Sequence, residues 1–161
     1  MIAKAGDVYC VYNKSLSKYT ACQVTKIDES GKEAQAVILS LDWAGDELPK
    51  EDELTLMKPL YIDYMYWGGT FNLKKVNVNV PANYIYVGNI TPLNNDDTCT
   101  YGSWGSGIEI YNQFKWQEIP KEQRDRFKEA NSSDEFGEFE GKRRRKNKHN
   151  ENDEWNDFDD A

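Results

Sequence analysis

Short runs of alternating apolar and polar residues, separated by turn residues, dominate this chain from Gly6 to Tyr111. The clearest run is Val76-Asn77-Val78-Asn79-Val80, with three valines on one face and two asparagines on the other, and Pro81 ends it. Side chains alternate between the two faces of a β-strand, and proline is tolerated only at strand ends and sheet edges. Runs this short with a period of two predict strands rather than helices. We therefore expect a mainly β fold.

The expected strands number seven or so and are short. They are two strands from Gly6 to Ile27 around a hairpin loop at 13–18, a mostly buried strand at 36–43, one or two weaker strands around 54–70, and strands at 76–80, 84–88 and 108–111. The first three form an antiparallel meander. Such a series of short strands predicts a small SH3-like barrel or a strongly bent antiparallel sheet.

The pattern changes near the C-terminus. Proline in the first turn, a Glu122 to Arg126 pair and good helix formers predict one short helix over 119–130, with Ile119, Phe127 and Ala130 towards the sheet. Residues 132–161 contain no Val, Leu, Ile or Met and run from acidic to basic to acidic. We expect a β-rich domain over 1–131 and a disordered polyampholyte tail over 132–161.

Residue types that the chain lacks exclude several functions. The only histidine is His149 and the first arginine is Arg124, so residues 1–123 lack the commonest general acid/base and the best bidentate phosphate ligand. The net charge of −8 opposes binding to nucleic acid or anionic membranes. Three cysteines without a CxxC pair indicate neither a disulfide framework nor a zinc site. We expect no enzyme, no catalytic residue, no metal and no cofactor.

Two other sequence features concern location and the tail. The chain has no apolar run long enough for a signal peptide or a membrane span, which predicts a cytoplasmic protein. The basic cluster Lys142–Lys148 is typical of nucleic-acid contact or nuclear localisation, but ten acidic residues flank it within the tail. We therefore interpret it as part of a self-compensating soluble tail.

Acidic and aromatic residues are the best candidates for function. The segment 44–53 carries Asp46, Glu47, Glu51 and Asp52 around Pro49 and predicts an exposed acidic loop. Aromatic residues are favoured anchors at protein interfaces, and we expect Trp67 and Trp104 to be exposed because glycines surround each. The expected partner-binding residues are Asp42, Trp43, Asp46, Glu47, Glu51, Asp52, Trp67 and Trp104.

Three segments together resemble a known family. They are Gly6-Asp7-Val8-Tyr9 leading to Tyr19–Val24, the strand, proline and strand block Val78–Gly88, and Trp116 followed by a helix at Pro120. Over residues 4 to about 130 the chain resembles the immunity protein 26 family of bacterial polymorphic toxin systems. The insertion at 44–75 and the tail depart from that pattern.

The resemblance implies an immunity protein that binds and neutralises a cognate toxin, often by covering its active site. Many such toxins are nucleases with basic clefts, which an acidic surface would attract. Two alternatives remain open: an SH3-like or Tudor-like adaptor that binds a peptide or a modified lysine through an aromatic cage, and a ribonuclease of the MazF type. The absence of Arg and His before residue 124 argues against the ribonuclease.

Overall fold

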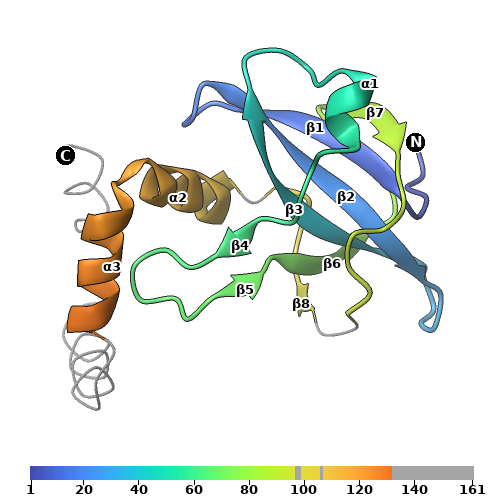
Figure 1. The fold of residues 1–161 in the computed structure, drawn as a ribbon. Coiled ribbons are helices and arrows are strands. Elements are labelled where there is room, and N and C mark those ends of the chain that lie inside the picture. Colours follow the sequence, from blue (N-terminus) through green and yellow to red (C-terminus); the bar gives the residue numbers. More distant parts are fainter. Residues whose placement is uncertain (97–98, 106, 132–161) are drawn as a thin grey trace. The chain divides into compact units, whose positions relative to one another are not determined.

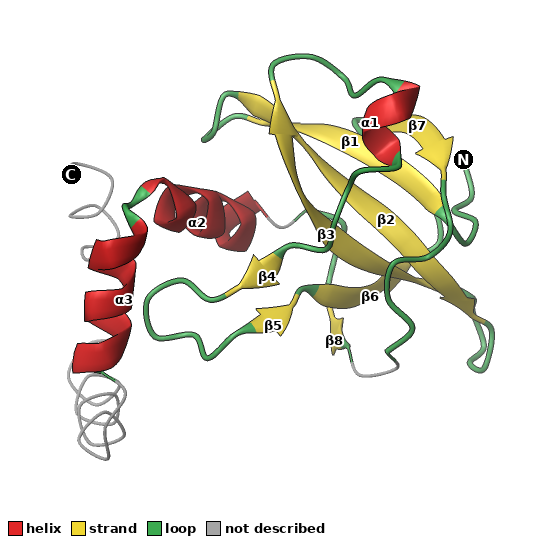
Figure 2. Cartoon of the chain, viewed as in Figure 1, coloured by secondary structure: helices red, strands yellow, loops and turns green. Residues whose placement is uncertain are grey.

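The computed structural model describes residues 1–96, 99–105 and 107–131, which are mostly β with helices near the C-terminal end (Figures 1 and 2). The chain divides into two compact units. The first contains Met1–Tyr61 and Thr70–Gly107, and the second contains Ile62–Gly69 and the described residues from Ile108 onward. Among the described residues, no helix is long and apolar enough to cross a membrane.

A six-stranded sheet forms the first unit, with the strand order β7-β1-β2-β3-β6-β8. Its strands are β1 (Asp7–Asn13), β2 (Lys18–Asp28), β3 (Gln35–Gly45), β6 (Leu73–Asn77), β7 (Ile85–Asn89) and β8 (Thr100–Tyr101). Strands β4 (Tyr61–Ile62) and β5 (Thr70–Phe71) make a separate two-stranded sheet. The expected meander is confirmed, since β1 to β3 are antiparallel neighbours.

The sheet is open, so of the two expected architectures, a small barrel or a bent antiparallel sheet, the barrel is wrong. Strands β7 and β8 stand at opposite ends of the strand order rather than pairing with each other. The sheet is also mixed rather than purely antiparallel, because β8 runs parallel to β6. A parallel pair needs a long crossover connection, and the chain supplies one in the segment between β6 and β8, which also contains β7.

Apolar side chains are buried on both faces of the sheet. Alternate residues of β1 belong to different core clusters, Val8 and Cys10 to one and Tyr9 to the other. In β3, likewise, Val37 and Leu39 belong to the first cluster and Ile38 belongs to the second. A strand covered on both sides is nearly continuous in apolar residues, which explains the uninterrupted run in β3.

A close contact brings the short helix α1 (Glu51–Leu54) onto one face of the sheet. A Cβ atom built at Gly88 of β7 would lie 2.5 Å from Leu54 Cδ1, a distance that real Cβ atoms do not show. Glycine at position 88 therefore lets α1 approach β7, so that Leu54 packs in the core cluster that also contains Met57. The acidic segment expected to be a loop thus includes one helical turn whose last residue is in the core.

One buried polar side chain, that of Gln23, fixes the long connection after β7. Gln23 is fully buried, and its Nε2 donates to the carbonyl oxygens of Ile90 at 3.0 Å and Thr91 at 3.2 Å. Its Oε1 accepts a hydrogen bond from Leu93 N at 2.9 Å. Because every polar atom of this amide is paired, its burial is compensated.

The strand expected at 76–80 is displaced. Strand β6 begins three residues earlier, at Leu73, and ends at Asn77. Residues 78–80 instead bond the N-terminal segment, with Ala3 N donating to Val78 O and Val80 N to Met1 O. The predicted common face is confirmed, since Val76, Val78 and Val80 all belong to one core cluster. The backbone partner changes, however, from β3 at Val76 to the N-terminal segment at Val78 and Val80.

The strand expected at 108–111 is wrong, because these residues begin the helix α2 (Gly107–Glu118). Buried positions recur every three residues at Ile110, Gln113 and Trp116, which is a helical period. A polar residue at the middle position concealed that period in the sequence. A four-residue apolar alternation is too short to separate strand from helix.

The expected C-terminal helix is confirmed as α3 (Lys121–Ala130), so two helices stand where one was predicted. The ring of Phe127 contacts those of Trp116 and Tyr66, whereas Ala130 is exposed, contrary to the expected inward direction. The predicted tail over 132–161 lies outside the described residues.

Candidate functional site

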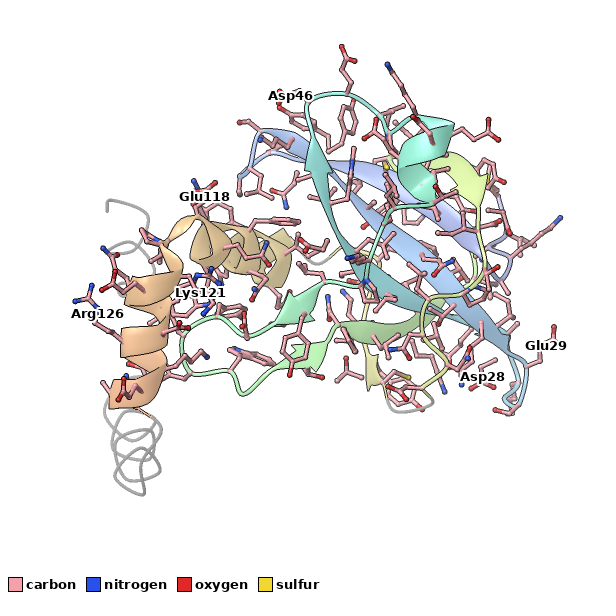
Figure 3. The ribbon with its side chains drawn as sticks, viewed as in Figure 1. Asp28, Glu29, Asp46, Glu118, Lys121 and Arg126 are labelled. Atoms are coloured by element: carbon pink, nitrogen blue, oxygen red, sulfur yellow. The ribbon has the colours of Figure 1, made fainter. Side chains whose placement is uncertain are left out.

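The acidic segment predicted from the sequence is exposed at one end of the large sheet. Asp46 and Glu47 lie in the turn after β3, and Glu51 and Asp52 form the first turn of α1. All four side chains are exposed, and among the described residues none of them makes an ion pair. Figure 3 shows Asp46 pointing away from the ribbon at this end. Residues 46–53 carry five carboxylates and one lysine, Lys50, so the segment presents net negative charge.

A pair of tyrosines, Tyr12 exposed and Tyr19 half-buried, lies beside this acidic turn. The rings of Tyr12 and Tyr19 meet edge to face with centroids 5.3 Å apart, and Tyr12 is 49% exposed. Tyr19 of β2 pairs directly with Gly45 of β3, the residue before Asp46. Strand register thus brings two aromatic rings to the same end of the sheet as the carboxylates.

Trp43 connects the aromatic and acidic parts. It is half-buried against the core, and its Nε1 donates to Glu53 Oε2 at 3.3 Å. Glu53 Oε1 also accepts from Lys50 N at 3.3 Å, which fixes the start of α1. A Cβ at Gly45 would lie 2.8 Å from the Trp43 ring, so the ring lies over the backbone of Gly45. These contacts hold the turn and α1 together.

We call this region the β3–α1 surface and define it by seven side chains. It comprises Tyr12, Tyr19, Trp43, Asp46, Glu47, Glu51 and Asp52. The first two were not among the predicted contact residues, because in sequence they follow the strand alternation and are indistinguishable from core residues. Only the register of β2 against β3 shows that they reach the acidic turn.

Three predicted site residues, Asp42, Trp67 and Trp104, are not part of the β3–α1 surface. Asp42 is exposed, but strand alternation directs it away from the face that holds Leu41 and Trp43. Trp67 is 47% exposed, as expected, and belongs to the second unit, whereas the β3–α1 surface belongs to the first.

The expected exposure of Trp104 is wrong. This residue is only 5% exposed and belongs to a core cluster with Tyr9, whose ring it contacts edge to face. Its Nε1 donates to Asn77 O at 2.7 Å, and its carbonyl oxygen accepts from Tyr84 Oη. Flanking glycines allow the chain to bring a large ring inward as well as outward, so they do not predict exposure.

Two of the three cysteines, Cys10 and Cys22, are buried in the core of the large sheet. Burial raises the pKa of the Cys10 thiol to about 12, and burial also raises the pKa of Cys22 to about 12. Both thiols are protonated at neutral pH, and the thiolate is the nucleophilic form. Within the described part of the chain, no group of three or more His, Cys, Asp or Glu side chains is placed to hold a metal ion.

The second unit contains a fixed loop that sequence reasoning did not identify. Gln113 Oε1 accepts hydrogen bonds from Asp63 N at 2.8 Å and Tyr64 N at 3.1 Å, and its Nε2 donates to Asp63 Oδ1 at 2.8 Å. Lys128 Nζ donates to the carbonyl oxygens of Met65 and Trp67. Two side chains from helices therefore hold the loop that displays Trp67.

Comparison with known proteins adds no relative. No family model, no curated protein and no solved structure matches this chain.

Proposed function

We propose that this protein binds a basic protein partner through the β3–α1 surface, and that it acts as an immunity protein which neutralises a bacterial toxin. The observation that carries the proposal is the placement of a tyrosine pair, of which Tyr12 is exposed, beside four exposed carboxylates, through the pairing of Tyr19 with Gly45. Toxin neutralisation rests in addition on the resemblance described above. A nuclease with a basic cleft is the partner class that this chemistry fits best.

The physical roles of the two residue types differ. Exposed carboxylates contribute little affinity one by one, but together they steer a basic partner and can raise the association rate by orders of magnitude at low salt. Tyrosine rings supply buried contact area with little loss of side-chain entropy. Charge on the acidic turn therefore sets the association rate, and the aromatic rings set the lifetime of the complex.

The first experiment tests whether a partner exists. The tagged chain is co-expressed with the product of the adjacent open reading frame, and growth is measured with and without the tagged chain. We expect the neighbouring product to co-purify and to stop growth only when this protein is absent. If it neither binds nor inhibits growth, the immunity proposal fails.

The second experiment tests the surface with a fourfold variant that carries Asp46→Asn, Glu47→Gln, Glu51→Gln and Asp52→Asn. We expect its association rate at low salt to fall by about tenfold or more, and the salt dependence to be largely lost. The matched control carries Glu29→Gln, Glu33→Gln, Asp96→Asn and Glu122→Gln, which changes net charge equally. Equal loss in both variants would attribute binding to net charge rather than to this surface.

The same observation favours one second candidate, an adaptor that captures a cationic side chain of a peptide. Tyrosine faces attract lysine or methyl-lysine, and neighbouring carboxylates add to that attraction. Titration with a lysine-rich peptide and its trimethylated form distinguishes the two functions. Peptide binding that Tyr12→Ala abolishes, without any toxin partner, would favour the adaptor.

A further inference from the structure

A long uncharged stretch lies at one edge of the large sheet. Residues 76–95 contain no Asp, Glu, Lys or Arg, although 30% of the chain is charged, and no other stretch without charge is as long. This stretch includes β7, one of the two edge strands of the six-stranded sheet. Strand β7 itself therefore adds no charge repulsion between two copies of a strongly acidic molecule.

The outer side of β7 is open among the described residues. On its inner side β7 pairs with β1 from Asp7↔Asn89 to Cys10↔Ile85, and within residues 1–96, 99–105 and 107–131 no strand pairs with its other side. Ile85 is 38% exposed and Tyr86 is 46% exposed. Edge strands present unpaired N–H and C=O groups, and proteins usually protect them with lysine, proline or other charges. Strand β7 carries none of these residues.

We propose that two copies of this chain associate through antiparallel pairing of their β7 edges, which joins the two sheets across a two-fold axis. Self-pairing centred on Val87 places Tyr86 of one copy opposite Gly88 of the other and Ile85 opposite Asn89, with no charged side chain from either strand in between. A charged strand from another protein would find no opposite charge on this edge. A second copy of this chain presents an uncharged strand of the same length.

Two features limit the strength of the pairing. Strand β7 has five residues, and its register with β1 shifts between Val8 and Tyr9, which leaves Val87 as an extra residue in a β-bulge. Bulges bend a strand and shorten the straight segment available for pairing. The association is accordingly a reversible one that depends on protein concentration.

Salt has a predictable effect on this dimer. Helix α1 packs on β7 at Gly88, and α1 carries Glu51, Asp52 and Glu53. Pairing two β7 edges brings two acidic α1 helices towards each other, and salt screens that repulsion. Self-association therefore strengthens with added salt, whereas binding of a basic partner to the β3–α1 surface weakens.

The test is the mass of the full chain in solution, measured by light scattering or sedimentation over a wide range of concentrations at low and high salt. We expect the mass to rise towards twice that of the monomer, more readily at high salt. Tyr86→Lys should raise the dissociation constant at least about tenfold, a change of about 1.4 kcal/mol. The matched control is Tyr61→Lys, because Tyr61 is 48% exposed and also makes one ring contact.

A second variant and a second measurement separate a loss of pairing from a loss of folding. Ile85→Lys places the charge at the neighbouring position if Tyr86→Lys folds poorly, and amide hydrogen exchange of β7 in the unmodified chain should slow as concentration rises. Three outcomes overturn the proposal. They are a monomer at every concentration and salt, a dimer that both lysine variants leave intact, and β7 amides that are equally protected in dilute solution, which would mean that another part of the same chain covers the edge.

Discussion

Lys128 Nζ of α3 donates a hydrogen bond to the carbonyl oxygen of Trp67 at 2.7 Å, and the same amine donates to the carbonyl oxygen of Met65. Met65 has a φ of 47°, a left-handed conformation that residues other than glycine seldom adopt. Burial lowers the pKa of Lys128 from its usual value, although Asp63 acts in the opposite direction. The partly buried ammonium group of Lys128 therefore holds the irregular loop that carries the exposed Trp67.

Lys128→Met should loosen this loop. It keeps most of the aliphatic chain but removes a part-buried hydrogen bond to Met65 O and an exposed one to Trp67 O, so we expect the free energy of unfolding to fall by about 1–2 kcal/mol. Amide exchange over residues 63–69 should accelerate. Lys121→Met is the control, since the exposed Lys121 pairs only with Asp125 one turn along, and such pairs contribute about 0.3–0.5 kcal/mol. Unchanged exchange in the Lys128 variant would contradict the role assigned to this amine.

Gly88→Ala should destabilise the first unit. The added methyl group would meet Leu54 Cδ1 at 2.5 Å, and overpacking of this kind typically lowers the free energy of unfolding by about 1–3 kcal/mol. Denaturant unfolding measures the change. Gly105→Ala is the matched control, because a Cβ there meets nothing within 4 Å. Combining Gly88→Ala with Leu54→Val should lose less stability than the sum of the two single changes, and strict additivity would argue against this contact.

Trp104 and Trp67 should respond very differently to truncation. Trp104→Ala removes a core ring and its hydrogen bond to Asn77 O, so we expect a loss of about 3–5 kcal/mol in the free energy of unfolding. Trp67→Ala should lose less than half as much, because its ring is 47% exposed. Chemical denaturation of the two variants checks the expectation. Similar losses would mean that the loop ring contributes to the fold as a core residue does.

The ion pair of Asp28 and Lys75 gives a pH dependence with a definite sign. Lys75 Nζ lies 2.6 Å from Asp28 Oδ2, and hydrogen bonds from Lys75 and Ser30 lower the pKa of Asp28. A carboxyl whose pKa is lower in the folded chain stabilises it above the ordinary value of about 3.9, and that contribution is lost as pH falls below this value. Asp28→Asn should therefore lower Tm at pH 7 but change it little in strong acid.

Glu29→Gln is the control for this pH experiment, because Glu29 is the neighbouring exposed carboxylate (Figure 3). It should leave Tm nearly unchanged at both pH values. The contact with Asp28 also raises the pKa of Lys75, so the pair persists up to alkaline pH. A Tm difference between Asp28→Asn and the unmodified chain that stays constant from neutral to acidic pH would exclude this ion pair as its source.

Local patterns in the sequence were sufficient for the elements that depend on near neighbours. Strands β1, β2, β3 and β7 follow from alternation and turn residues, and α3 follows from Pro120 immediately before it and from its helix-forming residues. The same reasoning failed to predict α2, because one of the residues that it buries at helical spacing, Gln113, is polar. Gln113 occupies a buried position because its amide bonds the loop at Asp63 and Tyr64, partners about fifty residues away in the chain.

The sequence by itself determined a mainly β chain, the acidic segment after β3 and the absence of histidine and arginine from the strands. Only the tertiary structure decided that the sheet stays open, that Trp104 is in the core and that Tyr12 and Tyr19 reach the acidic turn. The reason is physical. Propensity and alternation act over a few neighbouring residues, whereas strand order, register and burial depend on contacts between residues far apart in the chain.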